Sequence, residues 1–223
     1  MVEITQVIRT HRKTIALIVQ RDGRLVVRAP IRASDQAIRR LVESKEDWIR
    51  AKQQQVKATY LSIEPKKFVN GEDFWYQGQI YKLELVDYRL PALSLDGSFQ
   101  LSRHALYKAR RVFEGWYRQQ AVLVLPERVQ LLASRHGFTY HQVKITSART
   151  RWGSCNSRGT LCFAWRLIMA PLPVIDYVVA HELVHLQVKN HCKEFWGKVR
   201  LLMPDYRQRI KRLKSHGHLL LLD

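Results

Sequence analysis

Residues 181–185, His-Glu-Leu-Val-His, constrain the fold of this chain more than any other segment. The preceding residues Val174–Ala180 are apolar nearly all round, which predicts a helix buried in a hydrophobic core. Two histidines and a glutamate are costly to bury in such a helix unless they have a partner, and a metal ion is the simplest partner. The segment therefore predicts a buried helix that carries a metal site.

The spacing within this segment suits a single ion. His181 and His185 are four residues apart, so on a helix both imidazoles lie on one face. Glu182 lies about 100° further round the helix, beside the site. Zinc lowers the pKa of a bound water molecule to about 7, and a neighbouring carboxylate can then accept the proton as general base. We therefore predict His181 and His185 as metal ligands and Glu182 as the catalytic residue.

A catalytic zinc site needs a third protein ligand, for which His191 is the best candidate. The helix must end before this residue, and Lys189 and Asn190 are residue types that favour a helix C-terminus. The spacing equals that of the metzincin pattern, although Val188 stands where that pattern has glycine. Glu194 is an alternative ligand. Three neutral imidazoles suit one zinc ion per chain best, and nickel, cobalt or manganese can replace it in vitro.

The N-terminal part of the chain reads as strands with one helix. Residues 14–19 and 25–28 are β-rich and flank an Asp-Gly pair, which indicates a hairpin. Ser34 is the predicted N-cap of a helix over residues 35–59, and short strands follow over 66–95. The turn-rich segment after Pro91 leads us to separate residues 1–95, a β-rich N-terminal region, from residues 96–223.

Residues 96–223 are predicted to place helices around a small sheet, as in zincins, so the whole chain is α+β. One helix is expected from about His104, and a second begins after Pro126 and ends at Gly137. A strand over 143–146 and a hairpin of residues 151–155 and 160–165 follow. The last predicted elements are a helix over 174–189 and another from Lys193 that is interrupted at Pro204.

The chain is strongly basic, with 38 Lys and Arg against 19 Asp and Glu, a net charge of +19. This balance favours anionic partners, so we expect possible contacts with nucleic acid or a nucleotide through the basic surface. Three cysteines without a CxxC spacing argue against a disulfide framework or a cysteine zinc site. No apolar run is long enough for membrane insertion, and we expect a cytoplasmic protein.

Six segments of the C-terminal part form a recognisable combination: residues 151–155, 165–167, 170–171, 174–185, 190–191 and 195–196. Together with Asp22-Gly23, residues 28–30 and Trp48-Ile49, they resemble the YgjP-like family of zinc metallohydrolases over nearly the whole chain. This family is similar to SprT-type and Wss-type proteases, which are linked to DNA–protein crosslink repair, and to compact gluzincin peptidases. One departure is Ala164, where members often carry asparagine before the tryptophan.

The resemblance implies a zinc metallohydrolase with His181, His185 and His191 as ligands and Glu182 as catalytic carboxylate. It also implies that the strand beginning at Arg151 lines the cleft.

The hairpin of residues 151–165 is the predicted substrate-binding element. Zincin peptidases add an extended substrate to a sheet edge, and Arg151, Trp152 and Gly153 begin a strand that can supply this edge. Arg151 or Arg166 can stabilise an oxyanion or bind phosphate. The alternative is an ordinary core hairpin in which Trp152 only packs.

We therefore expect a zinc-dependent hydrolase, and specifically a metallopeptidase acting on a peptide or protein substrate. Two alternatives stay open. The same site can hydrolyse a phosphoanhydride of a nucleotide, or the chain can be a nucleic-acid-binding protein with a structural metal. Three histidine ligands argue against a structural metal, because structural zinc sites are usually closed by four protein ligands.

Overall fold

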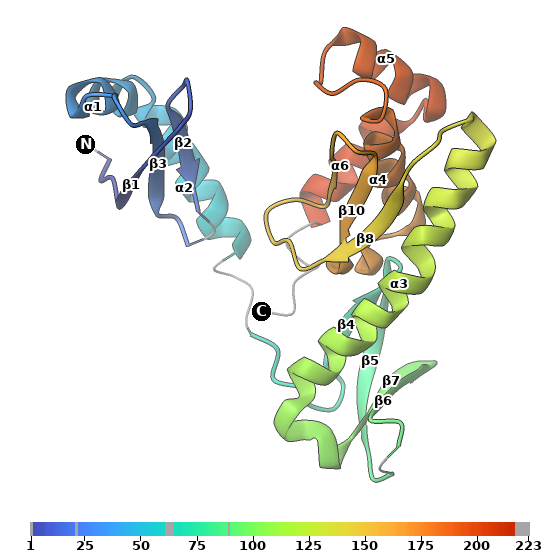
Figure 1. Cartoon of the computed structure of the whole chain (residues 1–223). Coiled ribbons are helices and arrows are strands. Elements are labelled where there is room, and N and C mark those ends of the chain that lie inside the picture. The colour runs from blue at the N-terminus through green and yellow to red at the C-terminus, as the bar shows by residue number, and fades with distance from the viewer. Residues whose placement is uncertain (1, 21, 61–64, 89, 217–223) are drawn as a thin grey trace. The chain divides into compact units, whose positions relative to one another are not determined.

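The computed structural model describes residues 2–20, 22–60, 65–88 and 90–216 of the 223-residue chain. The chain divides into two compact units, Met1–Glu64 and Pro65–Asp223 (Figure 1). Each unit has a hydrophobic core of its own.

The first unit is built on a three-stranded sheet in the order β1-β3-β2. The predicted hairpin is confirmed, since β2 (Ala16–Val19) pairs antiparallel with β3 (Leu25–Pro30). Gly23 takes a φ of +84° in its turn, a conformation that glycine adopts without strain. β1 (Gln6–Thr10) pairs parallel with β3 and was not predicted, because its residues are mostly exposed and show no apolar alternation.

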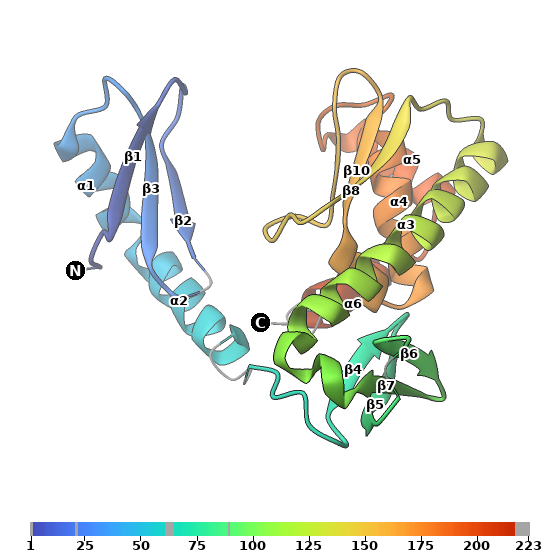
Figure 2. The same cartoon turned by 60° about the horizontal axis from the view of Figure 1, so that its bottom comes forward.

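Two helices cover one face of this sheet (Figure 2). Ser34 caps α1 (Asp35–Ser44), because its Oγ accepts a hydrogen bond from the Ala37 N–H at 3.2 Å. The prediction of one helix over 35–59 was wrong, since the helix breaks at Lys45 and α2 (Glu46–Tyr60) follows. Acidic residues at the start of α2 favour a new helix N-terminus there.

The second unit begins with a four-stranded sheet in the order β4-β5-β7-β6. β6 and β7 form an antiparallel hairpin whose turn is Gly97, with a φ of +69°. The sequence-based boundary between residues 95 and 96 falls inside this hairpin, because an Asp-Gly pair marks a tight turn as readily as a linker. The strands are β4 (Asp73–Tyr76), β5 (Gln79–Val86), β6 (Leu93–Asp96) and β7 (Ser98–Ser102).

A 28-residue helix, α3 (Ala109–His136), follows a 3₁₀ turn, η1 (Arg103–Lys108). The prediction that a new helix begins after Pro126 was wrong, because α3 continues through this proline. Pro126 removes one helical N–H, and the carbonyl four residues earlier belongs to Val122, which is exposed and can be solvated. Gly137 ends the helix in the left-handed conformation, as predicted.

The predicted hairpin of the second unit forms a small mixed sheet in the order β8-β10-β9. β10 (Thr160–Ala164) pairs parallel with β8 (Gln142–Thr146) and antiparallel with β9 (Gly153–Cys155). β9 is therefore an edge strand of this sheet.

The remaining helices surround α4 (Leu172–Val184), which contacts α3, α5, α6 and β9. Nine of its thirteen residues are buried, which confirms the predicted buried helix. It ends five residues earlier than predicted, at Val184. A 3₁₀ turn, η2 (Trp165–Met169), precedes it, and α5 (Lys193–Leu202) and α6 (Tyr206–His216) follow on either side of Pro204.

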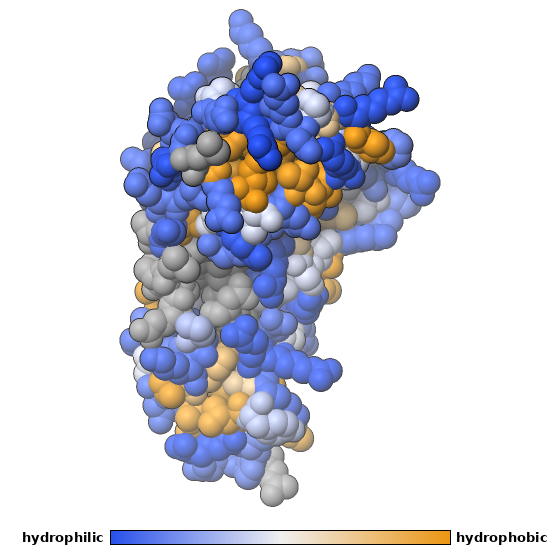
Figure 3. Space-filling model, turned by 90° about the vertical axis from the view of Figure 1, so that its left-hand side faces the viewer, coloured by the Kyte–Doolittle hydropathy of each residue, from blue (hydrophilic) through white to orange (hydrophobic). Residues whose placement is uncertain are grey.

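The architecture is α+β, as predicted, with small separate sheets and packed helices. The N-terminal region holds two helices and not the one expected. On the face shown in Figure 3, hydrophilic side chains surround a few apolar areas. Among the described residues, no helix is both long and apolar enough to cross a membrane.

Candidate metal centre

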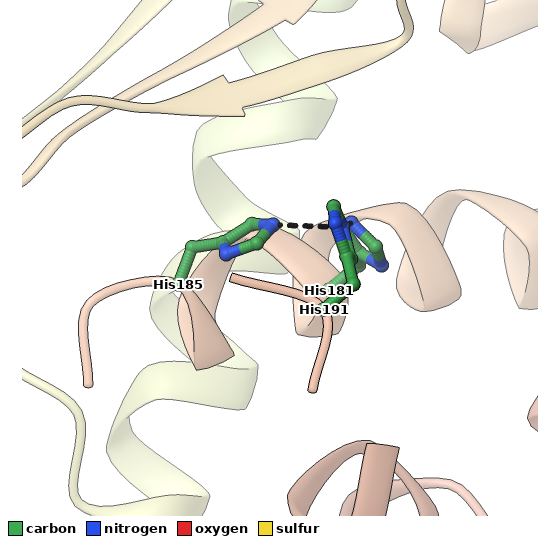
Figure 4. A group of neighbouring side chains, drawn as sticks. All are labelled: His181, His185 and His191. Carbon is green, nitrogen blue, oxygen red and sulfur yellow. Dashed lines mark hydrogen bonds between the residues drawn. The ribbon is translucent and has the colours of Figure 1, made fainter. Parts of the chain in front are cut away.

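Three histidines converge at the end of α4 (Figure 4). The Nε2 atom of His191 lies 3.0 Å from Nε2 of His181 and 3.2 Å from Nε2 of His185. His181 is in the last turn of α4, His185 is its C-cap, and His191 follows on the segment that leads into α5. In the described chain this is the one group of three or more His, Cys, Asp or Glu side chains with metal-binding geometry.

The donor set fits a zinc ion. Three nitrogens bound to a tetrahedral zinc at 2.0–2.1 Å lie about 3.3 Å apart, close to the two separations that His191 makes, and all three ligand atoms lie within 4.8 Å of one another. Hydrogen bonds alone cannot satisfy the group, because three neutral imidazoles whose Nε2 atoms meet cannot all pair with one another. A cation at their centre satisfies all three lone pairs.

A turn after α4 orients His185. Its Nδ1 lies 3.0 Å from the carbonyl oxygen of Val188, which fits an Nδ1–H donor and leaves Nε2 with a free lone pair. The same turn is closed by hydrogen bonds from the Gln187 and Val188 N–H groups to the carbonyl of Val184. The helix therefore ends early, and this lets the chain bring His191 back to the site.

His181 is held neutral. Burial, and then the neighbouring His185 and His191, lower its pKa to about 3, so the ring offers a lone pair at neutral pH. Its Nδ1 lies 3.5 Å from the hydroxyl of Tyr177, one turn earlier on α4. Burial also lowers the pKa of His185.

One aromatic ring supports the three imidazoles. Phe195 of α5 is fully buried, and its ring centroid lies 4.8, 4.5 and 4.8 Å from those of His181, His185 and His191. Trp196 stacks on His191 with the ring centroids 5.9 Å apart. The start of α5 therefore fixes the orientation of the imidazoles through packing.

Glu182 is buried beside the histidines with 5% of its surface exposed. Burial raises its pKa to about 7, and the charge of Arg151 opposes this shift. Its Oε2 atom is buried and makes no hydrogen bond with any described residue. A Cβ atom on Gly153 would lie 2.6 Å from Oε1 of Glu182, so glycine at this position makes room for the carboxylate.

The other predicted site residues lie in different environments. Arg151 is exposed just before β9, and Trp152 is half-buried against the main core. Arg166 is 3% exposed, with its guanidinium 4.2 Å from the ring centroid of Trp165, so it lies in the core. Glu194 is outside the histidine group and lies 4.0 Å from Lys198.

Sequence reasoning named the three histidines and Glu182 as candidates, but it did not predict which groups contact them. The contact of His185 with the Val188 carbonyl could not be predicted, because every residue has a backbone carbonyl and the residue type does not reveal its partner. Phe195 had one available signal, since it lies four residues after His191 and at the start of a predicted helix.

Three comparisons with known proteins bear on the family of this chain. A search of curated proteins finds no match. The metallopeptidase zymogen abylysin of Pyrococcus abyssi is 17% identical over 41% of this chain and 93% of its own, with a TM-score of 0.39. The zymogen jannalysin of Methanocaldococcus jannaschii is 19% identical over 43% of this chain and 96% of its own, with a TM-score of 0.37. The profile described as YgjP-like, metallopeptidase domain matches residues 13–216, and the chain therefore belongs to the YgjP-like metallopeptidase family.

Proposed function

We propose that this chain is a zinc-dependent peptidase in which His181, His185 and His191 hold the zinc and Glu182 is the general base. The family supports a metal-dependent peptide hydrolase. The observation that carries the residue assignment is the convergence of three Nε2 atoms at zinc-like separations beside a buried carboxylate. Nickel, cobalt or manganese can occupy the same imidazole site in vitro.

Bound at the three imidazoles, zinc supplies a Lewis acid that polarises a scissile carbonyl and acidifies a water molecule. Glu182 then accepts a proton at its carboxylate and returns it to the leaving amine. Burial raises the pKa of Glu182 in the metal-free site, and a cation held by the imidazoles would oppose this rise, which favours the ionised carboxylate that accepts a proton. Gly153 leaves room for the carboxylate, because a side chain at this position would enter the space that Glu182 occupies.

The outer edge of β9 is the proposed substrate-binding surface. An extended peptide can add to it through main-chain hydrogen bonds, since β9 pairs only with β10 in the described sheet. Gly153, the first residue of β9, contacts Glu182, so a peptide aligned on this strand passes the catalytic carboxylate. Arg166 is buried, and a direct role in substrate binding requires a rearrangement that exposes it.

The net charge of +19 favours anionic partners, so the proposal includes nucleic acid as a partner. Nucleic acid can recruit or activate the peptidase through the basic surface. A titration of DNA binding against salt tests this, because phosphate contacts weaken steeply as salt rises. Absence of binding at low salt would exclude the nucleic-acid role.

An activity screen tests the proposed function. Zinc-loaded protein is incubated with an unstructured protein such as casein and, separately, with nucleoside triphosphates. We expect proteolysis by the wild type and none by Glu182→Gln. The matched control is Glu194→Gln, an exposed carboxylate on α5 that we expect to leave proteolysis intact. Hydrolysis of triphosphates without proteolysis would replace the peptidase assignment with the phosphoanhydride alternative.

A further inference from the structure

Two exposed cations lie beside the proposed active site. Arg151 precedes β9 by two residues, and Lys189 directly follows Val188 in the segment after α4. Neither side chain makes a hydrogen bond or ion pair with any residue that the structure describes. Both charges are therefore available to an incoming ligand.

Of the two cations, Arg151 is the one near Glu182. Gly153, two residues later, contacts the Glu182 carboxylate, and the positive charge of Arg151 acts on that carboxylate against the effect of burial. Arg151 therefore lies at the start of the β9 edge.

Lys189 lies near the other end of that edge. Its neighbour Val188 accepts the hydrogen bond of His185. Its charge opposes the rise that burial causes in the pKa of Cys155, the last residue of β9, which places Lys189 near that end of the strand. Cys155 is four positions after Arg151, which corresponds to about 13 Å of extended chain.

Acidic residues are sparse in the part of the chain that builds this site. Residues 140–202 contain only three carboxylates, and none is exposed and unpaired. Asp176 pairs with Arg128, Glu194 lies beside Lys198, and Glu182 is buried. A peptide on the β9 edge therefore meets positive charge on both sides of Glu182.

We propose that the substrates of this site are extended peptides with an acidic side chain on each side of the scissile bond, recognised by Arg151 and Lys189. The proposal rests on the peptidase function and names its substrate class. Exposed charge pairs of this kind act mainly on ground-state binding, so the preference is expected in KM more than in kcat.

Matched peptide sets test the proposal. Quenched fluorescent peptides of one length carry Glu, Gln or Lys at each position around the cleaved bond. The acidic peptides should be cleaved with the highest kcat/KM, with up to about fivefold gained per charge pair. The preference should shrink at high salt, because ions screen exposed charges.

Charge variants assign the preference to residues. Arg151→Gln and Lys189→Gln should each remove the gain at one position, so that each variant cleaves Glu and Gln peptides with equal kcat/KM at that position. Arg151→Glu should transfer the preference at its position to Lys. The control is Lys144→Gln, which removes an exposed cation from β8, the opposite edge of the same sheet, and should change nothing.

The outcomes separate the two proposals. Equal kcat/KM for Glu and Gln peptides in the wild type would overturn the acidic preference and leave the peptidase intact. Cleavage of no peptide would overturn the peptidase assignment. In that case the acidic preference can still be tested by binding. Fluorescence anisotropy measures how tightly the same labelled peptides bind zinc-loaded Glu182→Gln. Tighter binding of Glu peptides that Arg151→Gln abolishes supports it, and equal binding of all peptides contradicts it.

Discussion

The two halves of α4 each contain a carboxylate, and the two carboxylates have opposite hydrogen-bonding environments. Near the start of the helix, Asp176 accepts two hydrogen bonds of 2.8 Å from the guanidinium of Arg128 on α3. Six residues later, Glu182 is more deeply buried, and its Oε2 atom has no hydrogen-bond partner in the described chain. The ion pair of Asp176 links α4 to α3. Burying the Glu182 carboxylate costs desolvation free energy, and no hydrogen bond to its Oε2 atom from the described residues offsets that cost. This difference supports the proposed catalytic role of Glu182 over a structural one.

The largest expected effect is on turnover. Glu182→Gln should lower kcat by about 10²–10⁴-fold, because it removes the proposed general base while keeping the shape of the side chain. Asp176→Asn should keep kcat within a few-fold, since that carboxylate only pairs with Arg128. Initial rates on one peptide, with the zinc content of each variant measured, make the comparison. Equal losses in both variants would remove the distinction between the two halves of α4.

The next effect is on folding stability. Asp176→Asn should lower the free energy of unfolding by about 1–3 kcal/mol, because it leaves the half-buried Arg128 without its partner. Urea denaturation measures this. Replacing both residues, with Arg128→Met added, should recover part of the loss. A change below about 0.5 kcal/mol, as at an ordinary surface position, would show that the pair does not hold α3 against α4.

Glu182→Gln should have the opposite effect on stability in metal-free protein. The pKa of Glu182 is about 7 in the folded protein against an ordinary 4.5, so between these values the folded state binds more protons than the unfolded state. Wild-type stability therefore falls as pH rises through this window, whereas glutamine does not titrate. We expect the variant to gain about 1–3 kcal/mol at pH 8 relative to pH 4.5.

Urea denaturation in the presence of a chelator at both pH values measures this gain. Glu194→Gln, at an exposed carboxylate, should show no such pH-dependent difference. An unchanged difference between wild type and Glu182→Gln at the two pH values would mean that Glu182 is not desolvated.

The smallest expected effect comes from the glycine that faces Glu182. Gly153→Ala places a Cβ 2.6 Å from Oε1, so the carboxylate must move, and kcat should fall about tenfold with zinc still bound. Gly115→Ala on α3 is the control, since its added Cβ has no atom within 4 Å. Full activity of Gly153→Ala would show that the position of Glu182 tolerates displacement.

The parts of the site that the sequence predicts are those that depend on local spacing. His181, Glu182 and His185 share one helix, and the 3.6-residue period places them together without knowledge of the rest of the fold. The approach of His191 depends on where α4 ends. That end is set by the turn that closes on Val184, and the sequence pattern places it five residues too late.

The predictions that failed depend on tertiary packing. Proline normally ends a helix, yet α3 continues through Pro126, because buried residues on both sides of it, Leu125 and Val129, pack in the same core. The strand β1 is mostly exposed, so only its pairing with β3 reveals it. The contacts of Phe195 with all three imidazoles likewise arise only when α5 folds back on α4.

Metal analysis tests the central claim most directly. Purified wild-type protein and Glu182→Gln should each carry about one zinc ion per chain, because the three imidazoles and not the carboxylate hold it. His191→Ala, which removes the ligand outside the helix, should lose the zinc while the protein stays folded by circular dichroism. Full zinc content in His191→Ala, or loss of zinc in Glu182→Gln, would contradict the assignment of the site.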